Sequence, residues 1–117
     1  MAPELILGHR AYNNKVDVWS LGIFAMELAQ GEPPHINEHH TRILFNIVQH
    51  EAPRIDSRWS TDFQDFADKC LDKNVERRWN SEMLINHPFL AGAENMRDEW
   101  CQEFCHWQQT RNNILPQ

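Results

Sequence analysis

Residues 15–30 read KVDVWSLGIFAMELAQ, and this run decides how the rest of the chain is arranged. Apolar residues occupy so many of its positions that a helix formed here carries apolar side chains on nearly every side. We therefore expect a central helix over residues 15–30 that is buried all round. The sequence GEPP at residues 31–34 ends it, because Gly suits a left-handed cap and prolines cannot continue the hydrogen-bond ladder.

The segment 38–50 predicts a second, peripheral helix. Its apolar side chains fall on one face, namely Ile43, Leu44, Ile47 and Val48. Its polar side chains are expected to point largely outward, and they comprise His39, His40, Arg42, Asn46 and Gln49.

A third helix is predicted behind Ser60, a candidate N-cap that is followed by Asp62 in the first turn. Its apolar residues repeat at steps of three and four: Trp59, Phe63, Phe66, Ala67, Cys70 and Leu71. A short helix capped by Asn80 or Ser81 follows, through Asn86, where Pro88 ends it.

A last helix is predicted from about residue 93 to residue 110, with one apolar stripe of Met96, Trp100, Phe104 and Trp107. We expect this helix to pack on the body through Met96, Trp100 and Phe104. No segment alternates apolar and polar residues as a strand does. The sequence thus predicts an all-α fold, and 117 residues suffice for one domain with one core.

Composition excludes several classes of function. A net charge of −6 argues against nonspecific nucleic-acid binding, which needs a cationic face for the phosphates. The apolar runs are interrupted by charges before they reach the length that spans a bilayer, so no membrane role is expected. Three Cys without a basic-then-apolar leader are typical of a reducing compartment, and we expect a cytoplasmic protein.

Five short strings follow one another along the chain: MAPE at residues 1–4, DVWSLG at 17–22, EPP at 32–34, RR at 77–78 and HPFL at 87–90. In this order and spacing they resemble the final third of the eukaryotic protein kinase domain. The run from residue 31 to 47 is similar to the sterile-like group, which includes germinal-centre kinases, p21-activated kinases and the kinase heads of class III myosins. The resemblance implies a partial kinase C-lobe over residues 1–90 and an extension helix and tail over 91–117.

The resemblance assigns structural roles to particular residues. Glu4 matches the Glu that ends the kinase activation segment, and Arg78 matches its buried Arg partner. Asp17, Trp19 and Gly22 match the motif at the start of the central helix, where Asp17 would anchor the catalytic loop; an acid in a first turn also stabilises a helix by itself. Phe24 and Leu28 match positions of the adenine-side spine.

Glu27 matches an acid that can face a basic substrate residue, although it can equally be a solvated side chain of the helix. Two residues depart from the family pattern. Trp79 stands where the family has Pro, and His35 stands where it has an aromatic residue. Because Trp79 needs room for a large ring beside Arg78, the turn around Arg78 is expected to differ from that of the family, which would weaken the Glu4–Arg78 pair.

Phosphoryl transfer needs a Gly-rich loop, a strand Lys with its Glu partner, a base Asp and a magnesium-binding Asp. The sequence contains none of these in the required order, so we expect no catalytic, cofactor-binding or metal residue in this chain. His9-Arg10-Ala11 resembles the catalytic-loop opening only by accident, since Ala11 replaces the base. Cys101, Cys105 and His106 lack the paired spacing of a zinc site.

Two hypotheses of function follow. In the first, the chain is a fragment of a serine/threonine kinase whose ATP and magnesium are bound by residues of the full-length parent. Its partners are then a protein substrate or the missing N-lobe and catalytic segment. In the second, it is a non-catalytic kinase-like module that docks protein partners. Met1 coincides with a residue before the Ala-Pro-Glu string, so the start is interpreted as an internal Met.

Overall fold

The computed structural model describes residues 1–8, 13–32, 34 and 37–114, and His9-Arg10-Ala11, Pro33 and His35 lie outside these ranges. The described residues form helices and loops without a strand, which confirms the all-α prediction. In chain order the elements are α1 (Pro3–Ile6), α2 (Lys15–Gln30), α3 (His40–Gln49), α4 (Thr61–Cys70), α5 (Ser81–Leu84), η1 (Pro88–Leu90), η2 (Ala93–Met96) and α6 (Arg97–Ile114). None of the described helices is both long and apolar enough to cross a membrane.

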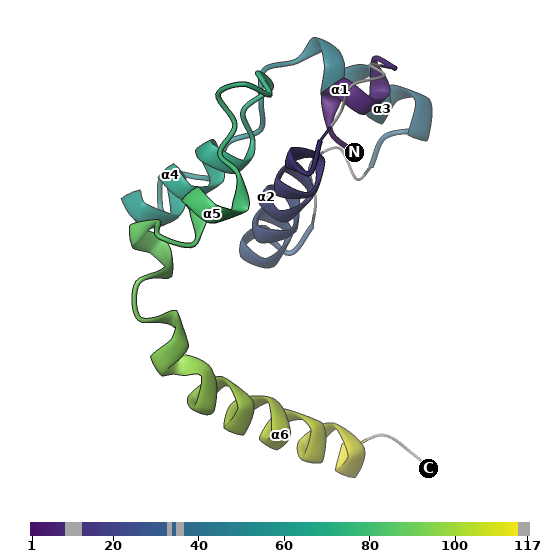
Figure 1. Cartoon of the computed structure of the whole chain (residues 1–117). Helices are drawn as coiled ribbons and strands as arrows, with labels where there is room; N and C mark the ends of the chain where they lie inside the picture. Colours follow the sequence, from purple (N-terminus) through teal and green to yellow (C-terminus); the bar gives the residue numbers. More distant parts are fainter. Residues whose placement is uncertain (9–12, 33, 35–36, 115–117) are drawn as a thin grey trace.

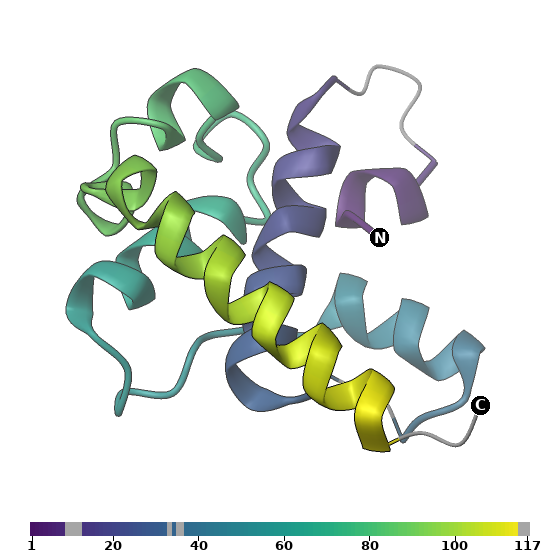
Figure 2. The ribbon, with the colours of Figure 1, turned by 90° about the horizontal axis from the view of Figure 1, so that it is seen from below.

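Helix α2 lies between two groups of elements (Figures 1 and 2). On one side α4 packs along it and α5 lies next to α4; on the other side lie α1 and α3, which contact each other. The core therefore forms where α2 meets α4, and its fully buried members include Trp19, Cys70 and Leu71. The prediction of a central helix over residues 15–30 is confirmed to the residue.

The prediction that α2 is buried on all sides is wrong. Val18, Trp19 and Met26 are buried, but Leu21, Phe24 and Leu28 are 43%, 55% and 71% exposed. The physical reason is that the described elements cover only part of the circumference of α2. Apolar residues on every face allow a helix to be buried on every face. Which faces are buried depends on the elements that pack against the helix.

Three helix ends follow the predicted signals, whereas α5 ends at Leu84, two residues before the predicted end at Asn86. The Ser60 hydroxyl accepts a hydrogen bond from the Phe63 N–H at 3.1 Å, and the Asn80 side chain accepts one from the Met83 N–H at 2.9 Å. Gly31 ends α2 with a φ of +86°, and its N–H donates to the Glu27 carbonyl at 2.7 Å. Side-chain caps and left-handed glycines are local devices, which is why the sequence predicts these boundaries well.

Helix α3 begins two residues later than predicted, after His39, whose side chain accepts a hydrogen bond from the Thr41 N–H. The outward placement of Asn46 is wrong, because this residue is only 2% exposed. Leu44, in contrast, was predicted on the inner face and is 41% exposed. The buried face of α3 is therefore rotated relative to the predicted one. The amide of Asn46 lies on the buried face, and the side chain of Leu44 does not.

The C-terminal helix does not pack on the body as predicted. The segment begins with the short 3-10 helix η2, and α6 then runs away from the other helices (Figure 1). Met96, Trp100 and Phe104 are 60%, 64% and 42% exposed, and every described side chain from residue 91 to 113 is exposed. The main packing partner of α6 is η2, so its aromatic stripe faces solvent.

Candidate functional site

Glu4 and Arg78 form a buried ion pair that joins α1 to the loop before α5. The Arg78 Nη1 donates to Glu4 Oε2 at 2.9 Å, and Nη2 donates to Glu4 Oε1 at 3.1 Å. The two residues are 4% and 1% exposed and are separated by 74 positions in the sequence. This is the two-pronged geometry in which a guanidinium and a carboxylate bind most strongly.

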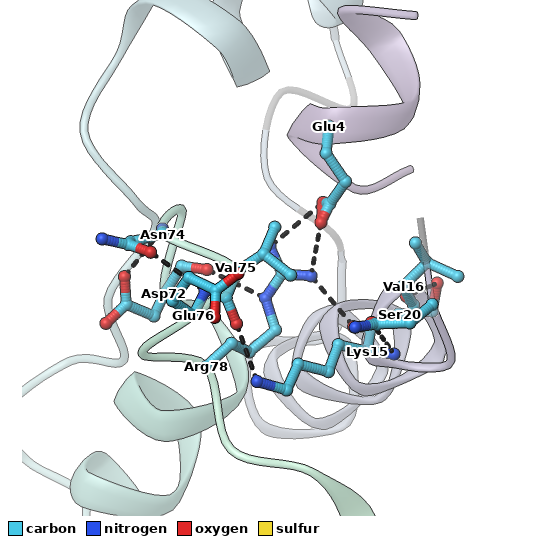
Figure 3. A network of polar contacts seen from close by, with 10 residues as sticks. Glu4, Lys15, Val16, Ser20, Asp72, Asn74, Val75, Glu76 and Arg78 are labelled. Atoms are coloured by element: carbon cyan, nitrogen blue, oxygen red, sulfur yellow. Dashed lines mark hydrogen bonds and ion pairs between the residues drawn. The ribbon is translucent and has the colours of Figure 1, made fainter. Parts of the chain in front are cut away.

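Arg78 also binds two backbone carbonyls. Its Nε donates to the Asp72 carbonyl and its Nη1 donates to the Lys15 carbonyl, both at 2.9 Å (Figure 3). The guanidinium carbon lies 5.2 Å from the centre of the Trp19 ring, within cation–π range. One side chain thus ties together α1, the first turn of α2 and the loop after α4.

Four of the five N–H donors of Arg78 are engaged in these contacts. Such a group has little capacity left for a substrate or a phosphate. Lys15 reinforces the same junction from α2, since its Nζ donates to the Val75 carbonyl at 2.9 Å. The arrangement therefore holds elements in place and does not itself move protons or bonds.

Gly22 lies on the side of α2 that packs against Cys70 and Leu71 at the C-terminal end of α4. A Cβ built on Gly22 would stand 2.7 Å from Leu71 Cγ and 2.8 Å from Cys70 Cβ. Carbon atoms do not approach so closely unless a side chain or one of the helices shifts. The position requires glycine because of this helix–helix contact, since its φ is helical and needs no special residue.

The other predicted site residues lie apart from the ion pair. Asp17 is exposed in the first turn of α2 and lines a shallow apolar depression together with Leu21 and Leu84. Glu27 is exposed near the other end of the same helix. The structure therefore brings Glu4, Arg78 and Trp19 together, with Gly22 one turn further along α2, and leaves Asp17 and Glu27 facing solvent.

Trp79 is accommodated without loss of the Glu4–Arg78 contact. Its backbone N–H donates to the Lys69 carbonyl at 3.2 Å, a bond that the proline of the family pattern cannot make. Its ring packs against the core, 5.7 Å from the ring of His87, and the Lys69 ammonium lies 5.6 Å above it. The departure at this position is therefore compatible with the buried ion pair.

Sequence reasoning missed the pair formed by His87 and Asp65. His87 is 3% exposed; its Nδ1 accepts from the Phe89 N–H at 3.0 Å, which leaves Nε2 to donate to Asp65 Oδ2 at 2.7 Å. The hydrogen bond from His87 holds the pKa of Asp65 below its ordinary value; burial acts in the opposite direction, and the Lys69 ammonium, 3.5 Å from Asp65 Oδ1, lowers the pKa further. The HPFL string marked His87, but no local signal marks a partner 22 positions earlier.

The Cys70 thiol is the most perturbed group near the site. Burial raises the pKa of Cys70 to about 12, with the Arg78 charge acting weakly in the opposite direction. A thiol with such a pKa stays protonated at neutral pH, and only thiolates are good nucleophiles. Cys70 is accordingly a core residue without reactivity.

Comparison with known proteins agrees with this geometry. The family model described as "Protein kinase domain" matches residues 1–90. The chain is 52% identical over 97 residues to serine/threonine-protein kinase pakB of Dictyostelium discoideum, which covers 81% of this chain and 11% of that protein. It is 43% identical over 98 residues to serine/threonine-protein kinase sid1 of Schizosaccharomyces pombe (84% and 21%).

A third relative is serine/threonine-protein kinase pakC of Dictyostelium discoideum, 50% identical over 92 residues, which covers 77% of this chain and 19% of that protein. The chain thus spans between about a tenth and a fifth of the length of these relatives. The matched range contains both partners of the buried ion pair and the motif around Trp19 and Gly22. The chain belongs to the protein kinase domain family.

Proposed function

We propose that this chain forms the helical scaffold beneath the active site of a serine/threonine protein kinase. The observation that carries the proposal is the Glu4–Arg78 ion pair, which fastens the Ala-Pro-Glu string to the loop before α5 across 74 positions of sequence, while Arg78 also binds the Lys15 carbonyl at the start of the central helix. In a kinase, the residues before this string bind the peptide to be phosphorylated. A scaffold that fixes their end therefore fixes where the substrate hydroxyl is presented.

The nucleotide belongs to other parts of the proposed enzyme. The sequence offers no Gly-rich loop, base Asp or magnesium-binding Asp, so ATP and magnesium would be held by kinase residues outside residues 1–117. The parent would transfer the γ-phosphoryl group of ATP to a serine or threonine hydroxyl of a protein. The run at residues 31–47 favours the sterile-like group among such kinases.

A chimaera tests the proposal directly. Residues 1–90 replace the corresponding segment of the pakC kinase domain, and phosphate transfer from labelled ATP to a serine-containing peptide is measured. We expect transfer by the chimaera and none by the isolated chain. A chimaera that folds but is inactive, or an isolated chain whose activity survives purification, would contradict the assignment.

Variants of the chimaera connect activity to the ion pair. Arg78→Met should abolish most of the transfer, because an unpaired Glu4 carboxylate is left in the core. Arg77→Met is the matched control, since Arg77 is adjacent and its side chain is 72% exposed. Equal activities of the two variants would show that the pair has no part in positioning the substrate-binding segment.

Glu27 is proposed to contact a basic residue of the substrate. Its carboxylate is exposed on α2 and has the charge to bind an arginine of a peptide. In the chimaera, Glu27→Gln should raise KM for peptides with an arginine near the acceptor serine and leave kcat little changed. A peptide without arginine is the control, and an equal rise in KM for both peptides would remove this role.

The alternative function is a binding module without catalysis, and the exposed face of α2 favours it. Leu21, Phe24 and Leu28 present apolar surface to solvent on one helix, and such a surface marks an interface or a site of aggregation. Sedimentation of the chain, compared with a variant in which all three residues are Ser, tests whether this face binds a second copy. A monomeric wild type that behaves like the variant excludes self-association through this face.

A further inference from the structure

Helix α6 carries one apolar stripe, and its main packing partner is the short helix η2. Figure 1 shows α6 leaving the body, and its described side chains are exposed. A helix of 18 residues is marginal in water by itself, because most helical stability in proteins comes from tertiary packing. A second surface that covered the stripe would therefore stabilise α6.

The stripe has the spacing of a heptad repeat. Steps of three and four residues alternate along α6 and define the α6 seam, which consists of Arg97, Trp100, Phe104, Trp107 and Arg111. Residues with this spacing occupy the a and d positions, through which two helices pack side by side. The seam therefore predicts that the surface covering α6 is another helix.

The side chains of the α6 seam are already ordered against one another. The rings of Trp100 and Phe104 stack with 5.3 Å between their centres, and those of Phe104 and Trp107 stack at 5.9 Å. The guanidinium carbon of Arg111 lies 5.4 Å from the centre of the Trp107 ring. Side chains that are held in this way lose less entropy when a partner covers them.

The charges of the seam select one orientation for a second copy of the chain. In a parallel pair Arg97 would face Arg97 and Arg111 would face Arg111, so like charges would meet inside the seam. In an antiparallel pair with full overlap of α6, Phe104 faces Trp107 and Trp100 faces Arg111, an arrangement that suits a cation–π contact. Arg97 then faces the last turn of the other helix, where the helix dipole is negative.

The flanks of the seam agree with the antiparallel orientation. Glu103 and Thr110 line one flank, and Cys101 and Gln108 line the other. Antiparallel helices bring identical flanks together, which places Glu103 beside Thr110 of the second copy and Cys101 beside Gln108. No charges of the same sign become neighbours at either flank. The surface of α6 is thus complementary to itself in one orientation.

We propose that α6 binds α6 of a second copy of this chain as an antiparallel pair of helices, joined through the α6 seam. Both copies use the same surface, as in other two-fold dimers. The three aromatic residues of the seam are about half exposed, so their burial in both copies removes roughly 600 Å² from water, half of the ~1,200 Å² typical of the smaller stable interfaces. The dimer is therefore weak and reversible. It lies outside residues 1–90, which the kinase family model matches, and does not depend on the proposed kinase function.

Sedimentation equilibrium of the 117-residue chain tests the pairing. A reducing buffer is needed, because Cys101 and Cys105 are exposed and could form disulfides between copies. We expect a monomer–dimer equilibrium with a Kd on the order of 100 μM. The double variant Trp100→Ala with Phe104→Ala should raise the Kd more than about tenfold, since it removes most of the buried rings. A wild-type chain that stays monomeric up to about 500 μM overturns the proposal.

Two single substitutions with the same change of charge test the orientation. Thr110→Arg places a guanidinium beside Glu103 of the second copy only in the antiparallel pair, and should lower the Kd about two- to fivefold because the contact forms twice. Gln108→Arg places it beside Glu103 only in a parallel pair and should leave the Kd unchanged. A tighter dimer with Gln108→Arg and an unchanged one with Thr110→Arg would contradict the antiparallel arrangement.

The exposed face of α2 is the competing surface for a second copy. The variant with Ser at Leu21, Phe24 and Leu28 should dimerise as the wild type does, because these residues lie outside the α6 seam. Loss of the dimer in this variant, together with its retention in Trp100→Ala with Phe104→Ala, would place the interface on α2 and overturn the proposal. Either result leaves the kinase assignment untouched, since the chimaera that tests it contains only residues 1–90 of this chain.

Discussion

Arg78 places a permanent charge in the core, and acceptors from the protein bind four of its five N–H groups. The Glu4 carboxylate takes two of its hydrogen bonds and two backbone carbonyls take the others. A buried ion pair adds little net stability over a well-packed apolar pair, because both charges lose their hydration. Its contribution here is positional, since the fork of the guanidinium allows one relative placement of α1, α2 and the loop at Asp72.

Removing one member of this pair should be far worse than removing a neighbouring charge. Arg78→Met leaves Glu4 unpaired in the core and should lower the free energy of unfolding by about 3–5 kcal/mol. Arg77→Met breaks only the exposed contact to Asp72 and should cost less than about 1 kcal/mol. Urea unfolding followed by circular dichroism measures both. Similar losses for the two variants would refute the distinction.

The three thiols should differ in reactivity by their burial. Cys101 and Cys105 are exposed, whereas Cys70 is buried with its pKa raised to about 12. At pH 8 a chromogenic disulfide reagent should titrate two thiols of the folded chain rapidly and the third only after denaturant is added. Rapid reaction of all three thiols in the folded chain would mean that Cys70 is not enclosed.

At the scale of elements, α2 and α4 are held together by a close contact that only glycine permits. Gly22→Ala should bring a methyl group against Leu71 and cost about 1–3 kcal/mol. Alanine favours a helix over glycine by about 1 kcal/mol, so the clash must outweigh this gain. The double variant Gly22→Ala with Leu71→Ala should be less destabilised than the sum of its parts. Stabilisation by Gly22→Ala alone would disprove the close packing.

The link between α4 and η1 should depend on acidity. Because the hydrogen bond from His87, together with the Lys69 ammonium, lowers the pKa of Asp65 below 3.8, these contacts stabilise the fold in full above that pH. Its contribution is lost as the pH falls through the folded-state pKa. The difference in stability between wild type and Asp65→Asn should be less than about 1 kcal/mol, as the carboxylate is half exposed, and should shrink toward zero below pH 3.8.

Measurement of unfolding between pH 5 and pH 2.5 checks this dependence. Asp62→Asn is a control on the first turn of the same helix. If the difference in unfolding free energy between wild type and Asp65→Asn grows as the pH falls, the pH dependence is opposite to the one predicted. Such a result would show that the hydrogen bond favours the protonated carboxyl.

The chain as described consists of a packed body and a projecting helix, α6. The core includes residues from position 2 to position 84, while the described side chains from 91 to 113 are exposed. An isolated helix of 18 residues in water is marginal, and most helical stability in proteins comes from tertiary packing. Helix α6 has little such packing.

Deletion of residues 97–117 should therefore leave the stability of the body nearly unchanged. The urea midpoint of the shortened chain is expected within experimental error of the wild-type value, with a loss of helical signal attributable to α6. The variant Trp100→Ala with Phe104→Ala serves as a matched control that keeps the length of the chain. A marked drop in the midpoint on deletion would mean that α6 stabilises the body.

The amino-acid sequence was enough to predict the all-α class, the four longer helices and the family, but not the short elements α1, η1 and η2. The C-terminal end of α2 follows from Gly31, and the N-caps of α4 and α5 follow from a hydroxyl and an amide side chain that act within a few residues. The motif strings identified Glu4 and Arg78 as partners across most of the chain. Local hydrogen bonds and steric restrictions of the backbone depend on residues that are close in sequence, so they can be predicted without knowledge of the fold.

Tertiary structure alone decided which faces are covered. The exposure of Leu21 and Phe24, the burial of Asn46, the pairing of His87 with Asp65 and the projection of α6 follow from which surfaces meet in space. An apolar periodicity states that a face can be buried but does not identify what buries it. Contacts between segments distant in sequence depend on the packing of the whole chain, because burial removes water only where a second surface is present.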